Sequence, residues 1–195
     1  DRSLIDSLDI PGENLEGYLF PETYHFDKNT DERAIVKTMV DTFKRRALKP
    51  EYLDRARELG FSFHKIITLA SLIEKETGRE DERELISAVF HNRLRKNMRL
   101  QCDPTVIYAL KNFDGNLRKK DLGIDSPYNT YRYAGLPPGP IANPGLESIR
   151  AALYPASANY IYFVSKQNGS HEFSSALADH NRAVRKYQLK KSGRS

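Results

Sequence analysis

Residues 63–78 read FHKIITLASLIEKETG, and this stretch decides the fold. Its apolar residues recur with the spacing of one helix face, and Gly78 is a residue that commonly follows the end of a helix. The stretch therefore predicts a helix over about 63–77 that packs its apolar face into a core. Two carboxylates, Glu74 and Glu76, lie in the last turn of that helix.

Helical periodicity continues on both sides of this segment. Asp81 and Glu84 have the spacing of a capping box, which would begin the next helix along the chain. Asp103-Pro104 has the form of a cap followed by proline at the first helical position. The other expected helices cover about 30–48 with Thr30 as N-cap, 50–60, 81–94, 103–110, 146–153, and a last one from Ser174 or Ser175 into the C-terminal tail.

A small antiparallel sheet is expected near the C-terminal end. Residues 160–165 alternate between polar and apolar side chains as a strand does, and Asn168-Gly169 is a strong two-residue hairpin signal. The return strand would cover 171–173. Helices with one small antiparallel sheet give an α+β fold class.

The stretch from 112 to 145 has little periodicity but contains five prolines among tyrosines, glycines and asparagines. A long loop in a compact domain is usually a binding or catalytic loop, so we expect an aromatic, proline-rich active-site loop. Tyr128, Asn129 and Tyr131 place flat rings beside hydrogen-bonding groups, which suits sugar rings. Tyrosines that pin the loop to the core are the alternative.

The charge of the chain is concentrated at one end. The 195 residues carry a formal net charge of +5, which alone would suit a nucleic-acid partner. Six positive charges and no acid lie in the last fifteen residues, so the other 180 residues have a net charge of −1. The body of the protein is close to neutral, and we expect no nucleic-acid partner.

Composition and motifs exclude several classes of protein. With 39% hydrophobic and 29% charged residues, the chain has the composition of a soluble globular domain. The single Cys102 excludes an intramolecular disulfide, and the five histidines lack metal-ligand spacing. Signature motifs of nucleotide-binding loops, zinc proteases and serine hydrolases are absent from the sequence. We expect no metal and no cofactor.

Glu74 and Glu76 have different surroundings on an ideal helix. At about 100° per residue they lie about 200° apart, so they cannot form a facing catalytic pair on that helix. Glu76 lies about 20° closer to the apolar face, where the pKa of a carboxyl group rises and suits a proton donor. The alternative is a solvated helix end in which both glutamates pair with Lys75 and Arg79.

A series of ordered strings makes the chain resemble the endolytic murein transglycosylases, the YceG-like family of bacterial cell-wall enzymes. The resemblance extends from about residue 15 to residue 187. The strings are LEG at 15–17, FPETY at 20–24, ASLIEKET at 70–77, VFHNRL at 89–94, MRLQ at 98–101, DPTVIY at 103–108, YNTY at 128–131, GLPPG at 135–139, IANPG at 141–145 and YFV at 162–164.

The resemblance implies cleavage of the β-1,4 bond between N-acetylmuramic acid and N-acetylglucosamine in peptidoglycan, leaving a 1,6-anhydro end without using water. One carboxyl group would act first as acid and then as base. Glu76 directly precedes Thr77, as the catalytic glutamate of lytic transglycosylases precedes Ser or Thr, so we expect Glu76 in this role and Glu74 as the alternative. The expected glycan contacts are Gln101, Tyr128, Asn129 and Tyr131, and Glu22 is a further carboxylate in a matching string.

The resemblance also implies a domain order, a location and partners. Residues 1–26 would end a preceding LysM-like region, 27–190 would form the catalytic domain, and 191–195 a basic tail. The family's N-terminal membrane anchor, which these residues lack, would hold the domain on the outer face of the cytoplasmic membrane, beside peptidoglycan synthases whose nascent strands it ends. The rival hypotheses are a muramidase, in which Glu74 or Glu22 assists a water, and a non-catalytic peptidoglycan-binding module.

Overall fold

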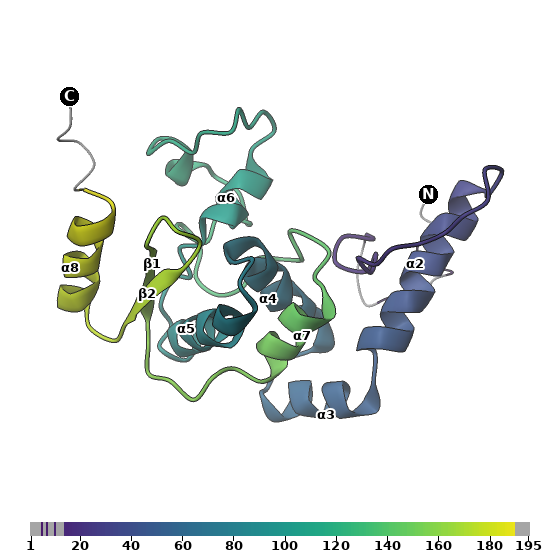
Figure 1. Cartoon of the computed structure of the whole chain (residues 1–195), viewed down its shortest axis with the longest axis horizontal. Coiled ribbons are helices and arrows are strands. Elements are labelled where there is room, and N and C mark those ends of the chain that lie inside the picture. The colour runs from purple at the N-terminus through teal and green to yellow at the C-terminus, as the bar shows by residue number, and fades with distance from the viewer. Residues whose placement is uncertain (1–4, 6, 8–9, 11–13, 190–195) are drawn as a thin grey trace.

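The computed structural model of the chain describes residues 5, 7, 10 and 14–189. The predicted basic tail at 191–195 lies outside the described residues, as does most of the segment before residue 14. The molecule is elongated, with a helical centre between two smaller ends (Figure 1).

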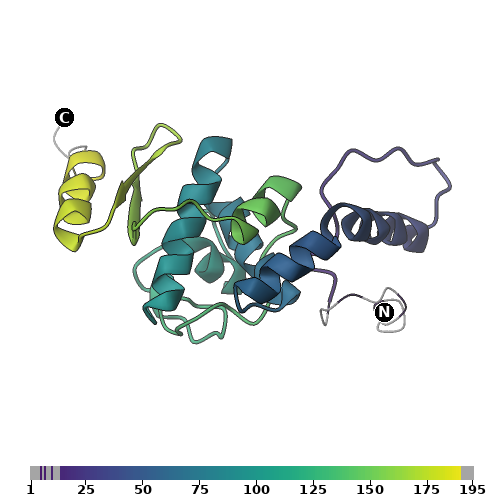
Figure 2. The same ribbon diagram turned by 90° about the horizontal axis from the view of Figure 1, so that it is seen from below.

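The helix predicted from the opening stretch lies at the centre of the molecule. α4 (Phe63–Glu76) packs along α7 (Leu146–Leu153) and α5 (Arg83–Arg95), and it also contacts the short helix α6 (Asp103–Ala109) (Figure 1, Figure 2). It ends at Glu76 because the next residue is extended, with φ −146° and ψ 138°. The fully buried side chains of α4 are Ile66, Ile67, Leu69, Ala70, Ser71, Leu72 and Ile73.

One end of the molecule is helical. α2 (Glu32–Ala47) and α3 (Pro50–Glu58) follow each other along the chain, and Gly60 stops the second helix with a positive φ of 76°. The sequence predicts Thr30 as the N-cap of α2, and this is wrong. Asp31 is the cap, because its carboxylate accepts the backbone N–H of Arg33 at 3.3 Å.

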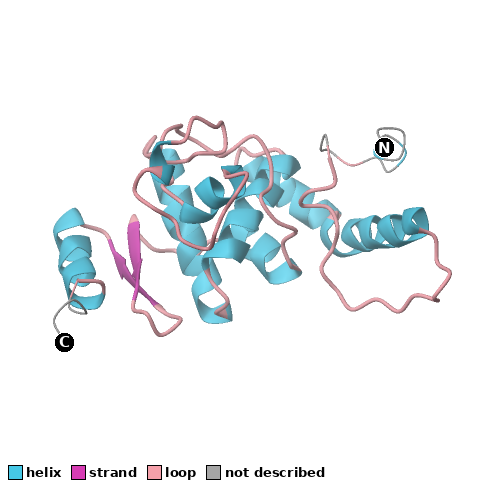
Figure 3. Ribbon diagram, turned by 90° about the horizontal axis from the view of Figure 1, so that it is seen from above, coloured by secondary structure: helices cyan, strands magenta, loops and turns pink. Residues whose placement is uncertain are grey.

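The other end of the molecule is the hairpin of β1 (Tyr162–Ser165) and β2 (His171–Ser174), with α8 (Leu177–Tyr187) packed against both strands (Figure 1, Figure 3). The strands are antiparallel and pair Phe163 with Phe173. The last helix begins later than predicted, because Ser174 still belongs to the sheet. The predicted mostly helical fold with one small antiparallel sheet is confirmed.

The predicted capping box at the start of α5 is wrong. A 3-10 turn, η1 (Glu80–Glu82), precedes this helix, and the carboxylate of Asp81 binds the guanidinium of Arg79 at 2.7 Å. Asp81 is therefore occupied by a neighbour within the turn and does not cap α5, which begins after Glu82 without a side-chain cap.

The predicted cap of α6 is also wrong. Asp103 lies inside the first turn, and Cys102 occupies the N-cap position. Pro104 is therefore the second residue of the helix, whereas the sequence predicts it as the first. Backbone N–H groups of the first turn have no partner within a helix, so a proline at this place removes no hydrogen bond. The carboxylate of Asp103 is left to bind elsewhere, in the site described below.

The segment from 14 to 20 packs against the helical centre. Tyr18 is fully buried, and its hydroxyl lies 2.6 Å from Nδ1 of His64 on α4. Oδ1 of Asn143 accepts the backbone N–H groups of Gly17 at 2.8 Å and Leu19 at 3.1 Å. A domain boundary near residue 26 stays a prediction.

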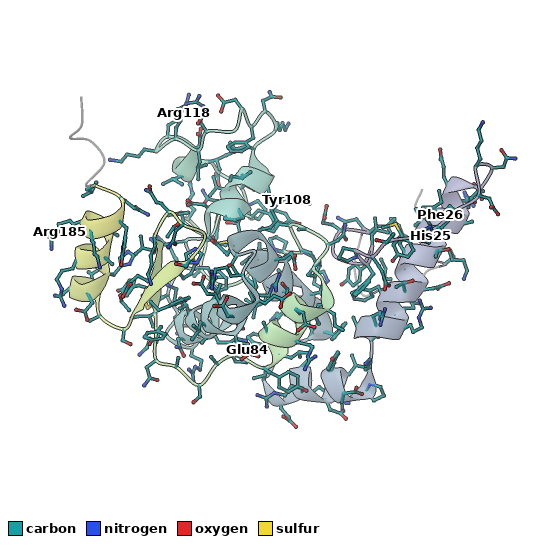
Figure 4. The ribbon with its side chains drawn as sticks, in the orientation of Figure 1. His25, Phe26, Glu84, Tyr108, Arg118 and Arg185 are labelled. Carbon is teal, nitrogen blue, oxygen red and sulfur yellow. The ribbon has the colours of Figure 1, made fainter. Side chains whose placement is uncertain are left out.

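Residues 21–30 form a loop at the α2 end of the molecule, away from the centre (Figure 3). His25 and Phe26 project from this end of the molecule (Figure 4). The stretch from 110 to 145 is the predicted long loop, whose helical content in the described structure is the 3-10 turn η2 (Asp121–Gly123). No helix among the described residues has both the length and the apolar character needed to cross a membrane.

Candidate active site

The C-terminal end of α4 opens into a cleft of about 380 Å³. One side of the cleft is formed by Glu76, Arg93 from α5 and the loop from 100 to 103. The hairpin and α8 form the other side. The lining residues are Glu76, Arg93, Leu100, Gln101, Asp103, Tyr131, Phe163, Val164, Ser165, His171, His180, Val184 and Gln188.

Glu76 is the carboxyl group whose environment suits acid and base chemistry. The residue keeps some accessible surface at the cleft, but its carboxyl group is surrounded by protein, and this burial raises its pKa to about 7. Hydrogen bonding from the thiol of Cys102 opposes the rise, and the negative charge of Asp103 adds to it. A group with a pKa near neutrality can donate a proton in one step and accept one in the next.

Glu74 has a structural position instead. Its Oε2 accepts the backbone N–H of Gly145 at 3.1 Å and the hydroxyl of Ser148 at 2.6 Å. These are the N-cap and a first-turn residue of α7, where a carboxylate also interacts favourably with the helix dipole. The two glutamates therefore face different neighbours, as the helix geometry predicts, and Glu76 is the one that lines the cleft.

Arg93 connects the two sides of the cleft. Its Nε donates to the carbonyl of Ile161, just before β1, at 2.7 Å. Its Nη1 donates to the carbonyl of Leu100 at 2.9 Å and to Oε1 of Gln101 at 3.2 Å. The guanidinium also lies over the ring of Tyr162, 5.4 Å from the centroid. Arg93 was not predicted as a site residue from the sequence, although it belongs to the matching string VFHNRL.

Gln101, one of the expected glycan contacts, lines the cleft in a strained backbone conformation. Its φ is 52°, in the left-handed region that a non-glycine residue enters at a cost of about 1 kcal/mol or more. The conformation is held because its backbone N–H donates to the carbonyl of Thr130 at 3.2 Å. With Oε1 bound to Arg93, the amide NH₂ of Gln101 is oriented as a donor.

Tyr131 also lines the cleft, and it forms a hydrogen bond with Asp103, which lines the cleft too. The phenol donates to Oδ1 of Asp103 at 2.5 Å. Burial first, and then the Asp103 carboxylate, raise the pKa of the Tyr131 phenol above its ordinary range. Because the sequence predicts Asp103 as a helix cap, its carboxylate was missed as a member of the cleft.

The other two residues expected to hold the glycan lie elsewhere. Asn129 is fully buried, and its amide donates to the carbonyls of Leu122 and Ile124 at 3.0 and 2.8 Å, so it organises the loop. The ring of Tyr128 packs against Tyr108, 4.9 Å between centroids. The contact of Tyr128 fits the alternative in which tyrosines hold the loop, and Asn129 holds the loop through its amide. A glycan contact of either residue stays a prediction.

Glu22 lies outside the cleft. Its Oε1 accepts from Arg46 of α2 at 2.7 Å, at the helical end of the molecule. A larger cavity, of about 1050 Å³, lies beside the first turns of α4 and is lined in part by His64, His91 and Arg95. The described residues that line it include no carboxylate, so it offers no counterpart to Glu76. In the described part of the chain, no group of three or more His, Cys, Asp or Glu residues is placed to hold a metal ion.

Comparison with known proteins agrees with the resemblance seen in the sequence. The family model of the YceG-like family matches residues 2–186. A Bacillus subtilis (strain 168) protein named endolytic murein transglycosylase is 47% identical over 89% of the chain. A protein of the same name from Streptococcus pneumoniae serotype 2 is 32% identical over 93% of the chain. The chain covers 48% and 34% of the lengths of these two relatives.

A solved structure has the same fold. The crystal structure of a yceG-like protein from Listeria monocytogenes superposes with a TM-score of 0.84 at 40% sequence identity. The match covers 94% of this chain and 64% of that one.

Proposed function

The chain belongs to the YceG-like family, and from this premise we propose that it is the catalytic part of an endolytic peptidoglycan transglycosylase. It would cleave the β-1,4 bond between N-acetylmuramic acid and N-acetylglucosamine within glycan strands and leave 1,6-anhydro ends. The observation that carries the proposal is that the carboxyl group of Glu76, which lines a polar cleft, has a pKa of about 7.

The proposed reaction uses Glu76 twice. The protonated carboxyl group donates its proton to the glycosidic oxygen while the bond from that oxygen to C1 of the muramyl sugar breaks. The resulting carboxylate then accepts the proton of the muramyl 6-hydroxyl as O6 forms a bond to C1. The proton that leaves Glu76 in the first step is replaced in the second, so the carboxyl group is regenerated and no water is consumed.

The neighbours of Glu76 favour both of its states. Burial and the charge of Asp103 favour the neutral acid that the first step requires. Hydrogen bonding from Cys102 favours the carboxylate that the second step requires. Opposing influences of this kind hold a pKa close to the working pH, where one group can exchange a proton in both directions.

The expected glycan contacts are Gln101 and Tyr131, the two predicted residues that line the same cleft. Gln101 would donate through its amide NH₂. Tyr131 gives its hydrogen to Asp103, so its phenol oxygen remains an acceptor for a sugar hydroxyl.

The test is the mass of the products from purified peptidoglycan. Digestion by the wild-type chain should give glycan ends lighter by one water than hydrolysed ends, and Glu76→Gln should give none. Intact strands with the wild-type chain would favour the non-catalytic binding module.

A muramidase is the second candidate, because Asp103 places another carboxylate in the cleft of Glu76. Asp103 could orient or deprotonate a water that attacks C1. Neither residue considered for this purpose from the sequence lines the cleft, since Glu74 binds α7 and Glu22 binds Arg46. Reducing ends in the digest would identify hydrolysis.

The proposal extends to the place of action. Cleavage of nascent strands beside peptidoglycan synthases requires a domain on the outer face of the cytoplasmic membrane, and a membrane anchor outside residues 1–195 would hold it there. Copurification of the full-length protein with synthases from membranes would support this setting, and recovery of that protein in the cytosol would contradict it.

A further inference from the structure

One imidazole in the hairpin wall of the cleft is held in a fixed orientation by a buried carboxylate. His171, the first residue of β2, lines the cleft that contains Glu76. Only 10% of its side chain and 9% of the Glu82 side chain are exposed. The proposed reaction assigns no part to this pair, so its burial calls for another explanation.

Glu82 binds His171 at two points. Its Oε1 accepts the backbone N–H of His171 at 2.9 Å, and its Oε2 lies 2.7 Å from Nδ1 of the ring. Because a carboxylate accepts hydrogen bonds and cannot donate them, Nδ1 carries the hydrogen of this contact. In the neutral ring, Nε2 is then the nitrogen with a free lone pair.

Aromatic rings fix the plane of the imidazole. The ring of Phe163 meets it edge to face at 5.4 Å and 89°, and Phe173 lies 6.3 Å from it. Rotation of the ring would break the Nδ1 contact with Glu82. Within the described residues, no hydrogen bond uses Nε2, so this nitrogen is an oriented acceptor without a protein partner.

The proposed ligand needs acceptors as well as donors in the cleft. A peptidoglycan strand brings hydroxyl and acetamido N–H donors on every sugar. Beside Glu76, the neutral carboxyl group and the amide NH₂ of Gln101 donate, whereas the Tyr131 phenol oxygen and the Asp103 carboxylate accept. His171 Nε2 would add an acceptor from the hairpin.

We propose that His171 is a substrate-positioning residue, held by Glu82 as the Nδ1–H tautomer so that Nε2 accepts a hydrogen bond from a glycan hydroxyl or acetamido N–H in the Glu76 cleft. This inference rests on the proposed function for the nature of the ligand. It adds the hairpin to the binding site and gives the buried Glu82 a role as the residue that sets the tautomer.

Glu82→Gln tests the tautomer directly. The backbone N–H of His171 can only donate, so it would retain the oxygen of the substituted side chain as its acceptor and leave the new amide NH₂ facing Nδ1. Nδ1 must then accept, and the hydrogen moves to Nε2, which becomes a donor. We expect about tenfold weaker glycan binding, with a corresponding rise in KM, and a ¹⁵N spectrum that shows the Nε2–H tautomer.

A second measurement avoids any loss of folding in that variant. In Glu76→Gln, which should bind but not cleave, the ¹⁵N resonance of His171 Nε2 is followed while a tetrasaccharide of alternating N-acetylglucosamine and N-acetylmuramic acid is added. A shift of that resonance supports the proposal. An unchanged Nε2 resonance, while the Gln101 amide resonance shifts, overturns it.

The controls are Glu172→Gln and His25→Gln. Glu172 follows His171 in the hairpin but pairs with Lys166 at 3.1 Å, and His25 is exposed at the far end of the molecule (Figure 4). Both variants should bind glycan as the wild type does. A change of tautomer in Glu82→Gln without weaker binding contradicts the role of His171. Failure of the wild-type chain to cleave peptidoglycan, with the Nε2 shift present, contradicts only the proposed reaction.

Discussion

The phenol of Tyr131 donates a 2.5 Å hydrogen bond to Oδ1 of Asp103, and both side chains line the cleft that contains Glu76. The contact keeps a second carboxylate beside the proposed acid/base. The consequences of that carboxylate can be measured separately from those of Glu76.

Asp103→Asn should lower the pKa of Glu76, because it removes a nearby negative charge that disfavours ionisation. The alkaline side of the pH profile of kcat/KM should therefore move to lower pH. The products decide the chemistry: 1,6-anhydro ends that persist in this variant support the transglycosylase, whereas reducing ends that occur in the wild type and vanish in the variant identify Asp103 as the base of a muramidase.

Glu76→Gln should reduce the rate of strand cleavage by at least about a hundredfold, since it removes the proton donor. Glu74→Gln should leave cleavage measurable but lower the free energy of unfolding by about 1–2 kcal/mol, because it weakens the contacts of Oε2 with Gly145 and Ser148. Muropeptide release and thermal unfolding measure the two effects. The reverse pattern, an active Glu76→Gln and an inactive folded Glu74→Gln, would show that the assignment is wrong.

The activity should fall as the pH rises through about 7, because burial raises the pKa of Glu76 to that value and the first step needs the protonated form. The pH profile of kcat/KM measures this fall.

The free energy of unfolding should also decrease as the pH rises over the same range. The folded state holds this proton more tightly than the unfolded chain, for which the value is 4.5. Stabilisation from the proton is therefore complete below about 4.5 and is lost as the pH rises to about 7. Urea titrations across this range should show the slope in the wild type and a smaller one in Glu76→Gln.

Cys102→Ala should raise the pKa of Glu76 further, because it removes the hydrogen bonding that favours the carboxylate. The alkaline side of the pH profile should move upward, opposite to the change expected for Asp103→Asn. Cys102→Ser retains a donor and serves as the matched control.

Because burial also raises the pKa of the Cys102 thiol well above its ordinary value, the native chain should react slowly with iodoacetamide and the unfolded chain rapidly. Rapid modification of the folded chain would contradict this environment.

Gly17→Ala should destabilise the fold by about 3 kcal/mol, because the residue has a φ of 90° and an added Cβ would lie 2.5 Å from Cγ of Pro140. Gly60→Ala is the matched control. Gly60 also has a positive φ, of 76°, but an added Cβ would meet no atom within 4 Å, so the expected loss is about 1–2 kcal/mol. Urea unfolding measures the free energy of unfolding of both variants. Equal decreases would mean that the added Cβ at residue 17 does not clash with Pro140.

The elements that the sequence could predict are those with strong local signals. Apolar periodicity identified α4, and Asn168-Gly169 identified the hairpin, because both signals depend on residues close together in the chain. The helix starts were less predictable. Asp31 and Thr30 are both good caps, and only the path of the backbone selects one.

The candidate site was predictable in part for the same reason. Glu76 follows from its position on one helix, whereas the cleft opposite it is formed by segments distant in sequence. Nothing near Asp103 shows that Tyr131 will bind it, and nothing near His171 shows that Glu82 will. The position of Asn129 in the loop could not be predicted, because the local sequence around a buried amide that organises a loop looks the same as that around an amide that binds sugar.

The hydrogen bonds of the Arg93 guanidinium bear on how a glycan strand could bind beside Glu76. One planar guanidinium binds the carbonyl of Ile161, just before β1, and the carbonyl of Leu100, in the loop that follows α5. Arg93 therefore couples the segment before β1 to the loop that carries Gln101. A movement of the hairpin away from this loop would have to break the hydrogen bonds of Arg93, so we expect the two segments to move together when a glycan strand binds beside Glu76.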